Sequence, residues 1–296
     1  MEHAKAVSCT GLLPMAYCKK AEQTKGRPGR EDGKNMEEVG YVAPTPQVFY
    51  IHDDLSAYVR QTQGADSLAF RLTQELLRAV RRTPQRVVVL TVEEQIAQLL
   101  VQGSYAPFTM TLGIGRAGER VAQQLHARTG WFPALRRVEV TREEDGQGGY
   151  RLVSTTATPL EEQLQGLGTV SALAVVDDTV FSGLTMRTVL RALPPSVLVR
   201  TQVFCLRGVA ESLPSIRALC PITIGFAAPG RILEEVSFIN ATGLVLRVAI
   251  RRAGQAPLAF FDRPTWMHAW FPGYAEEVMS LCRRLHTLLE PQTAPS

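Results

Sequence analysis

Two adjacent carboxylates near the middle of the chain follow a short apolar run and precede a turn rich in hydroxyl groups. The run 173–176 suits a buried parallel strand, Asp177 and Asp178 come next, and the segment 182–185 (Ser-Gly-Leu-Thr) leads into helical spacing. A helix N-terminus presents unpaired backbone N–H groups that bind phosphate. Carboxylates accept hydrogen bonds from a vicinal diol. One ligand fits both halves: a ribose whose hydroxyls face the aspartates and whose 5′-phosphate lies in the turn.

The segment 175–185 resembles the phosphoribosyl-pyrophosphate (PRPP) binding signature of type I phosphoribosyltransferases: apolar residues, two acids, a spacer, Ser or Thr, Gly, any residue, then Thr. The resemblance implies that Asp177 and Asp178 are catalytic, that they hold the ribose hydroxyls, and that they contact Mg²⁺ indirectly through PRPP and water. It implies that the 5′-phosphate is bound by Thr179, Val180, Phe181, Ser182, Gly183, Leu184 and Thr185. The alternative is an ordinary strand-to-helix turn with Ser182 as the N-cap.

A second glycine-bearing turn follows an earlier predicted strand. The apolar run 108–112 leads into Gly-Ile-Gly-Arg-Ala-Gly at 113–118, and a helix is expected over 119–128. Glycine allows a backbone to approach an anion closely, and arginine adds a charged fork. The turn resembles the pyrophosphate-binding loop of the same family, which implies a pyrophosphate site formed by Gly115, Arg116, Ala117 and Gly118.

A polar, glycine-rich stretch at 142–149 separates two short predicted strands at 137–141 and 150–154. It is similar to the family's flexible loop, which closes over the active site and excludes water. The resemblance makes Arg142 a candidate pyrophosphate contact. An ordinary hairpin tip is the equally weighted alternative.

Alternating strands and helices predict an α/β fold with a doubly wound parallel sheet, a core like that of the type I phosphoribosyltransferases. Further strands are expected at 198–206 and 222–226, with a helix over 209–219 interrupted by Pro214. Ligands of such sheets lie at the carboxyl ends of the strands. The expected domains are a disordered tail at 1–45, an N-terminal addition at 46–106, the core at 107–228 and a C-terminal cap or hood at 229–296.

The segments outside the core have weaker signals. Strands are expected at 49–51, 87–90 and 244–250, and helices at 92–101, at 275–289 and after a Ser67 cap. The aromatic run 260–274 could form the hood, in which case Trp266 and Trp270, with Phe181, would bind the acceptor by stacking. Packing of the last helix onto the rest of the protein is the favoured alternative for the run.

One position departs from the pattern of purine-type family members. These enzymes commonly carry an Asp immediately before the Ser or Thr of the loop, and here the residue is Phe181. A phenyl ring cannot transfer a proton, so acceptor chemistry that needs an acid or base at this position is in doubt. The acceptor is therefore left open.

Composition narrows the class of protein without deciding its function. The chain has 296 residues, 45% of them hydrophobic, and a formal net charge of +4, which does not require a nucleic-acid partner. Five scattered cysteines (Cys9, Cys18, Cys205, Cys220 and Cys282) favour a reducing cytoplasm over a disulfide framework. No apolar run is long enough to predict a membrane span.

Two functions are therefore weighed first. The first is transfer of a 5-phosphoribosyl group from PRPP to a small nitrogenous acceptor, such as a nucleobase, with release of pyrophosphate and with Mg²⁺ as cofactor. The second is a PRPP-sensing or PRPP-binding regulator of the same fold without turnover. A homodimer is compatible with either function, and an interaction module working through its N-terminal tail is a third hypothesis.

Overall fold

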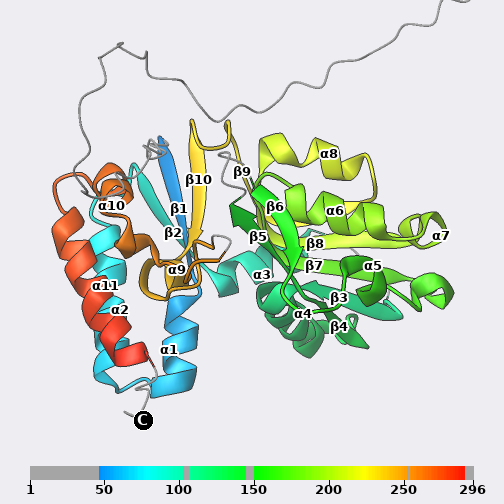
Figure 1. Ribbon diagram of the computed structural model, residues 1–296, viewed down its shortest axis with the longest axis horizontal. Coiled ribbons are helices and arrows are strands. Elements are labelled where there is room, and N and C mark those ends of the chain that lie inside the picture. The colour runs from blue at the N-terminus through cyan, green and yellow to red at the C-terminus, as the bar shows by residue number, and fades with distance from the viewer. Residues whose placement is uncertain (1–46, 103–106, 145–149, 252–253, 291–296) are drawn as a thin grey trace, which may run out of the picture.

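The structure, a computed structural model, describes residues 47–102, 107–144, 150–251 and 254–290, and the expected tail at 1–45 lies outside these ranges. Two parallel sheets with their covering helices lie side by side (Figure 1). A small antiparallel hairpin stands apart from both sheets. Among the described residues, no helix has the length and apolar character needed to cross a bilayer.

The larger sheet has five strands in the order β4-β3-β7-β8-β9, and every neighbouring pair is parallel. The central strand β7 begins with four fully buried residues, as expected for a parallel strand that is covered on both faces. The strands are β3 (Met110–Ile114), β4 (Leu135–Val138), β7 (Leu173–Val180), β8 (Thr201–Val209) and β9 (Ile222–Ala228).

Helices cover both faces of this sheet, so the prediction of a doubly wound fold is confirmed. One face packs against α3 (Val92–Val101) and α4 (Gly115–Thr129), around the rings of Phe132 and Phe204. The opposite core includes residues of α5 (Leu160–Gln163), α6 (Leu184–Ala192), α7 (Pro195–Leu198), α8 (Pro214–Arg217) and the 3₁₀ turn η1 (Leu167–Thr169). A further 3₁₀ turn, η2 (Ala210–Ser212), precedes α8.

The smaller sheet joins segments that are far apart in the sequence. Its order is β10-β1-β2, all parallel, with β10 (Val236–Asn240), β1 (Val48–Asp53) and β2 (Val87–Thr91). Helices cover one face and bury Phe49 and Ile51. They are α1 (Leu55–Gln63), α2 (Leu68–Val80), α9 (Ala241–Val245), α10 (Pro264–Trp270), α11 (Ala275–Leu289) and the turn η3 (Phe260–Asp262). We call this assembly the three-stranded unit.

The other face of the small sheet packs against the large one. Tyr50 and Phe238, which alternate with the helix-facing residues, contact Phe226 of β9 with ring centroids 5.2 and 6.4 Å away. Alternation along a strand sends successive side chains to opposite faces. One face of the small sheet therefore packs against its own helices, and the other face packs against the five-stranded sheet.

Local signals placed several elements correctly. Ser67 caps α2 by accepting the Phe70 N–H at 3.0 Å, and α11 has the expected bounds. The strand expected at 244–250 is wrong: α9 occupies the start of that range, and β10 precedes it. α9 packs closely against η3: a Cβ on Gly243 would lie 2.8 Å from the Phe260 ring. This contact between segments is not visible in the local sequence pattern. The strand expected from 198 begins at Thr201, after α7.

Candidate functional site

The two motif-bearing turns lie at one edge of the large sheet. β3 and β7 are adjacent and parallel, whereas β4, which follows β3 in the chain, lies on the other side of β3. The strand order thus reverses between β3 and β7. In open α/β sheets, ligands bind outside the carboxyl ends of the strands at such a point. The turn after β3 thus lies beside the acidic pair at the same edge of the sheet.

Asp177 belongs to β7 and is more buried than a cleft-facing carboxylate would be. The strand runs on to Val180, and the Asp177 residue is only 8% exposed. Its Oδ1 accepts the backbone N–H of Asp178 at 2.8 Å. Burial, followed by repulsion from Asp178, raises the pKa of Asp177 well above its usual range. Ionised Asp177 is therefore an electrostatically unfavourable group in the folded protein.

Asp178 has a different environment. Its Oδ2 accepts hydrogen bonds from Arg207 Nη2 and from Asn240 Nδ2, each at 3.1 Å. Burial acts to raise the pKa of Asp178, but the Arg207 charge and the Asn240 hydrogen bond contribute to holding it at about 2. The adjacent acids thus have pKa values displaced in opposite directions, which is a pattern typical of functional sites.

Arg207 connects the acidic pair to a buried polar network. The arginine is completely buried, and its Nη1 lies 3.5 Å from Gln95 Oε1 of α3. The Gln95 amide nitrogen lies 2.8 Å from His52 Nδ1 at the end of β1. Burial and then the Arg207 charge lower the pKa of His52 well below its usual range, so the imidazole is neutral at pH 7. The polar network joins the two sheets.

The phosphate turn is shorter than the sequence indicates. Thr179 and Val180 are the last residues of β7, and Leu184 and Thr185 open α6, so only 181–183 form the turn. Gly183 has a φ of +73°, a conformation in which a side chain would be strained. The Leu184 N–H donates to Ser182 Oγ at 3.4 Å. The segment still brings a helix N-terminus to the edge of the sheet, where a phosphate can bind.

Neighbouring side chains hold the carbonyl groups of this turn. Ser212 Oγ donates to the Phe181 carbonyl at 2.5 Å. Arg187 Nη1 donates to the Ser182 carbonyl and to Ser215 Oγ, both at 3.0 Å. The turn therefore has a fixed shape before any ligand binds.

The expected pyrophosphate loop is the first turn of a helix, which corrects the expected loop at 115–118. α4 begins at Gly115, where φ is +58°, and the exposed Arg116 lies in its first turn with Ala117. Gly118 has a packing role, because a Cβ there would lie 2.4 Å from the Val176 carbonyl oxygen. The glycine thus lets α4 lie close against β7. The backbone N–H groups of this helix start remain suited to an anion.

The hairpin of β5 (Val140–Glu144) and β6 (Tyr150–Ser154) confirms the strand expected at 150–154, while its tip at 145–149 lies outside the described residues. The strand expected at 137–141 is divided between the end of β4 and the start of β5, and the first residues of the expected polar loop, 142–144, belong to β5. Arg142 is exposed on β5, and its charge acts to lower the pKa of Asp177. The structure thus brings Arg142 within electrostatic range of the acidic pair.

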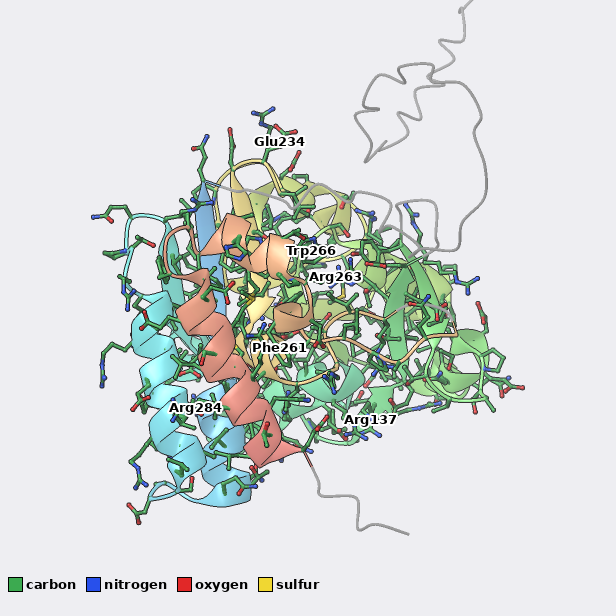
Figure 2. All side chains as sticks on the ribbon, turned by 60° about the vertical axis from the view of Figure 1, so that its left-hand side comes forward. Arg137, Glu234, Phe261, Arg263, Trp266 and Arg284 are labelled. Carbon is green, nitrogen blue, oxygen red and sulfur yellow. The ribbon has the colours of Figure 1, made fainter. Side chains whose placement is uncertain are left out.

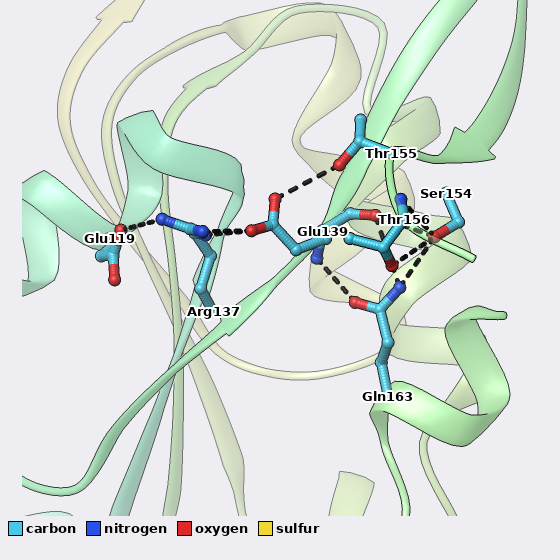
Figure 3. Close-up of polar contacts among 7 residues, drawn as sticks. All are labelled: Glu119, Arg137, Glu139, Ser154, Thr155, Thr156 and Gln163. Atoms are coloured by element: carbon cyan, nitrogen blue, oxygen red, sulfur yellow. Dashed lines mark hydrogen bonds and ion pairs between the residues drawn. The ribbon is translucent and has the colours of Figure 1, made fainter. Parts of the chain in front are cut away.

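A polar network fixes the base of this hairpin to α4 (Figure 3). Arg137 donates to Glu119 Oε2 at 2.7 Å and also pairs with Glu139, the residue between β4 and β5. Gln163 Oε1 accepts the Glu139 N–H at 2.6 Å, and Gln163 Nε2 donates to Ser154 Oγ at 3.0 Å. The hairpin is therefore held at its base beside the start of α4.

Trp266 and Trp270 do not lie where an acceptor could stack on them, and this corrects the sequence expectation. Trp270 is 2% exposed, and its ring lies 4.8 Å from that of Phe49 in the core of the three-stranded unit. Trp266 packs at the same core and under the guanidinium of Arg263, 5.6 Å away (Figure 2). The structure therefore agrees with the favoured alternative, in which the aromatic run packs against the rest of the protein.

Phe181 belongs to another aromatic cluster. It packs where the two sheets meet, against an apolar group that includes Val209, Phe226 and Phe238. Phe181 and the run 260–274 lie in different clusters, because the helices of that run cover the far face of the small sheet. This cluster therefore draws on both sheets: Val209 and Phe226 belong to the large sheet, and Phe238 belongs to the small one.

Sequence reasoning missed Arg207 and Asn240. A signal for the first existed: an arginine inside the apolar strand Thr201–Val209 must find a buried partner. Asn240 offers a weaker signal, as a polar residue that ends an apolar strand. Neither signal names the partner, because that depends on which strands meet.

The acidic pair can support a magnesium ion only together with a ligand. The ranges that the structure describes contain no group of three or more His, Cys, Asp or Glu side chains suited to a metal. Carboxylate oxygens are the donors Mg²⁺ prefers, and this ion commonly takes its remaining ligands from water and substrate phosphates. Asp177 and Asp178 therefore fit an indirectly held Mg²⁺.

Asp54, the N-cap residue between β1 and α1, gives a testable pH dependence. Burial raises its pKa from 3.8 to about 6, although Thr242 donates its N–H at 2.9 Å and its hydroxyl at 2.6 Å. Since the folded-state pKa is raised, the stabilisation from proton binding is full below about pH 4 and is lost as the pH rises through about 6. Relative to Asp54→Asn, the wild type should lose on the order of 2–3 kcal/mol in urea unfolding between pH 4 and 7. Parallel pH profiles for the two proteins would contradict this.

Comparisons with known proteins give only a distant likeness. No family model matches the chain, and no curated protein matches its sequence. A purine phosphoribosyltransferase from Pyrococcus horikoshii Ot3 is 16% identical with a TM-score of 0.33, over 51% of this chain and 91% of that one. A Helicobacter pylori xanthine-guanine-hypoxanthine phosphoribosyltransferase is 11% identical with a TM-score of 0.31, over 64% and 91%. A Neisseria gonorrhoeae hypothetical protein with bound ppGpp is 16% identical with a TM-score of 0.33, over 49% and 81%. The fold assignment rests on this chain's own strand order.

Proposed function

We propose that the chain transfers a 5-phosphoribosyl group from PRPP to a small nitrogenous acceptor and releases pyrophosphate. One observation carries the proposal. An acidic pair and the N-termini of two helices, α4 and α6, lie at the carboxyl ends of the adjacent strands β3 and β7. A ribose that carries a phosphate on one side and a pyrophosphate on the other needs this combination of diol acceptors and two anion sites.

Each part of the site has a role in the proposal. Asp177 and Asp178 accept hydrogen bonds from the ribose hydroxyls. The segment 179–185, whose turn and helix start are held by Ser212 and Arg187, binds the 5′-phosphate. The first turn of α4, with Arg142 on the hairpin, binds the pyrophosphate that leaves.

Catalysis would come mainly from positioning and electrostatics. Breaking the bond between C1 of the ribose and pyrophosphate leaves an oxocarbenium-like centre, which the acceptor nitrogen attacks with its lone pair. Bound Mg²⁺ would supply charge neutralisation of the pyrophosphate. Exclusion of water from the site would protect this centre from hydrolysis.

A regulator that binds PRPP without turnover is the second candidate. The observation that favours it is the buried network from Asp178 to His52, which links the acidic pair to the three-stranded unit. A pyrophosphate-release assay with PRPP, Mg²⁺ and a panel of hypoxanthine, guanine, adenine, uracil, orotate and simple amines separates the two. Release with one acceptor supports the enzyme. PRPP binding without release supports the regulator, and absence of PRPP binding contradicts both.

Phe181 should limit the choice of acceptor. We expect the wild type not to use hypoxanthine or guanine efficiently, because no acid or base stands at this position. Phe181→Asp would place a carboxylate against the apolar cluster where the two sheets meet, so it should lower stability by about 1–3 kcal/mol and lower turnover. Turnover of both proteins over the same panel checks this. Efficient wild-type use of either purine would show that the proton is handled elsewhere.

A further inference from the structure

Residues from two other strands hold the second acid of the pair. Arg207 Nη2 and Asn240 Nδ2 both lie 3.1 Å from Asp178 Oδ2, and Arg207 Nη2 also donates to Asn240 Oδ1 at 2.5 Å. Each of the three side chains thus contacts the other two. We call this closed set the Asp178 clamp. Asp178 and Arg207 come from the large sheet, whereas Asn240 comes from the three-stranded unit.

The amide of Asn240 has no other structural task among the described residues. Asn240 is the N-cap of α9, but its side chain makes no capping hydrogen bond. It ends β10 opposite His52 of β1, so the small sheet fixes its position. The guanidinium that it contacts is itself held by Gln95 and by the Phe238 ring, 5.9 Å away. The amide is therefore placed rigidly against Asp178.

The clamp occupies one oxygen of Asp178. In the part of the chain that the structure describes, no N–H group donates to Asp178 Oδ1 or to Asp177 Oδ2. Each ionised carboxylate has capacity for further hydrogen bonds. The two carboxyl groups also hydrogen-bond each other, so the capacity left to accept from a ligand hydroxyl belongs to the pair rather than to each acid separately.

We propose that Arg207 and Asn240 are positioning residues that orient Asp178 toward a ribose hydroxyl, and that Asn240 makes the three-stranded unit part of the ribose site. The inference rests on the proposed function. A carboxylate already held in its binding orientation loses no rotamer freedom when the ligand binds. Affinity for PRPP then depends on a residue of the second sheet.

Asn240→Ala tests this, with Thr242→Val as the matched control. Thr242 lies two positions further along, in the first turn of α9, and donates to Asp54, so its loss perturbs the three-stranded unit without touching Asp178. With Mg²⁺ present, we expect Asn240→Ala to bind PRPP about tenfold more weakly in calorimetry. The KM for PRPP should rise by a similar factor, and the KM for the acceptor should stay unchanged. Thr242→Val should lower the unfolding temperature and leave both KM values unchanged.

The outcomes separate the inference from the proposed function. Wild-type affinity in Asn240→Ala, or an equal loss in Thr242→Val, overturns the inference and leaves the transferase proposal standing. A wild type that does not bind PRPP overturns both.

A ligand-free arm tests the clamp itself. Asp178→Asn and Asn240→Ala are combined in a double-mutant cycle of urea unfolding. We expect the unfolding constants to deviate from additivity by about fivefold. Additive effects would show that no clamp exists.

Discussion

Replacing Arg207 by methionine is expected to lower the free energy of unfolding by about 3–5 kcal/mol. Arg207 is completely buried, and it supplies the charge that contributes to keeping Asp178 ionised in a buried position. Methionine fills most of the volume but leaves the carboxylate without a counter-charge. Urea unfolding at pH 7 measures the loss. The deficit should be smaller at pH 4, because without Arg207 the raised pKa of Asp178 allows it to bind a proton.

Two variants make this result specific. Arg231 is 63% exposed and pairs with Glu234 on the surface, so Arg231→Met should change stability by no more than about 0.5 kcal/mol. Adding Asp178→Asn to Arg207→Met should recover part of the lost stability, since the amide needs no counter-charge. Stability within about 1 kcal/mol of wild type for Arg207→Met would show that the network is not held together by this charge.

Asp177→Asn is expected to separate binding from stability. The amide replaces an acceptor oxygen by an N–H donor that a ribose hydroxyl cannot match as well, so the affinity for PRPP should fall on the order of tenfold. The free energy of unfolding should stay the same or rise at pH 7. Burial and Asp178 disfavour ionised Asp177, whereas the amide is neutral and its oxygen can still accept the Asp178 N–H. Calorimetry with PRPP and Mg²⁺ and urea unfolding measure the two effects.

Asp262→Asn is the matched control for this variant. The Asp262 side chain is 18% exposed, accepts the Ala259 N–H at 3.0 Å and pairs with Arg247 in the three-stranded unit. This substitution should lower stability and leave PRPP binding unchanged, the reverse of the Asp177→Asn pattern. Unchanged PRPP affinity in Asp177→Asn would count decisively against the proposed ribose site.

The sequence by itself determined those features that depend on neighbours along the chain. The buried run 173–176, the acidic pair and the glycine turn before α6 follow from strand composition, turn residues and helical spacing. The same local signals gave the bounds of α11 and the Ser67 cap. The alternation of strands and helices was sufficient to predict a parallel sheet with its ligand edge at Asp177.

Tertiary structure decided which of these elements meet. β1 pairs with β10 at Val48 and Val236, far apart in the chain, and no periodicity specifies such a partner. The same pairing brings Asn240 to Asp178, and it places the 260–274 aromatics in a core behind the small sheet. From the sequence, Gly118 was assigned to a pyrophosphate-binding loop. In the structure its lack of a side chain lets α4 approach Val176 closely, which is a packing role. Charge pairing and close packing depend on distance in space, and here those distances follow from a sheet whose strands β1 and β10 are far apart in the sequence.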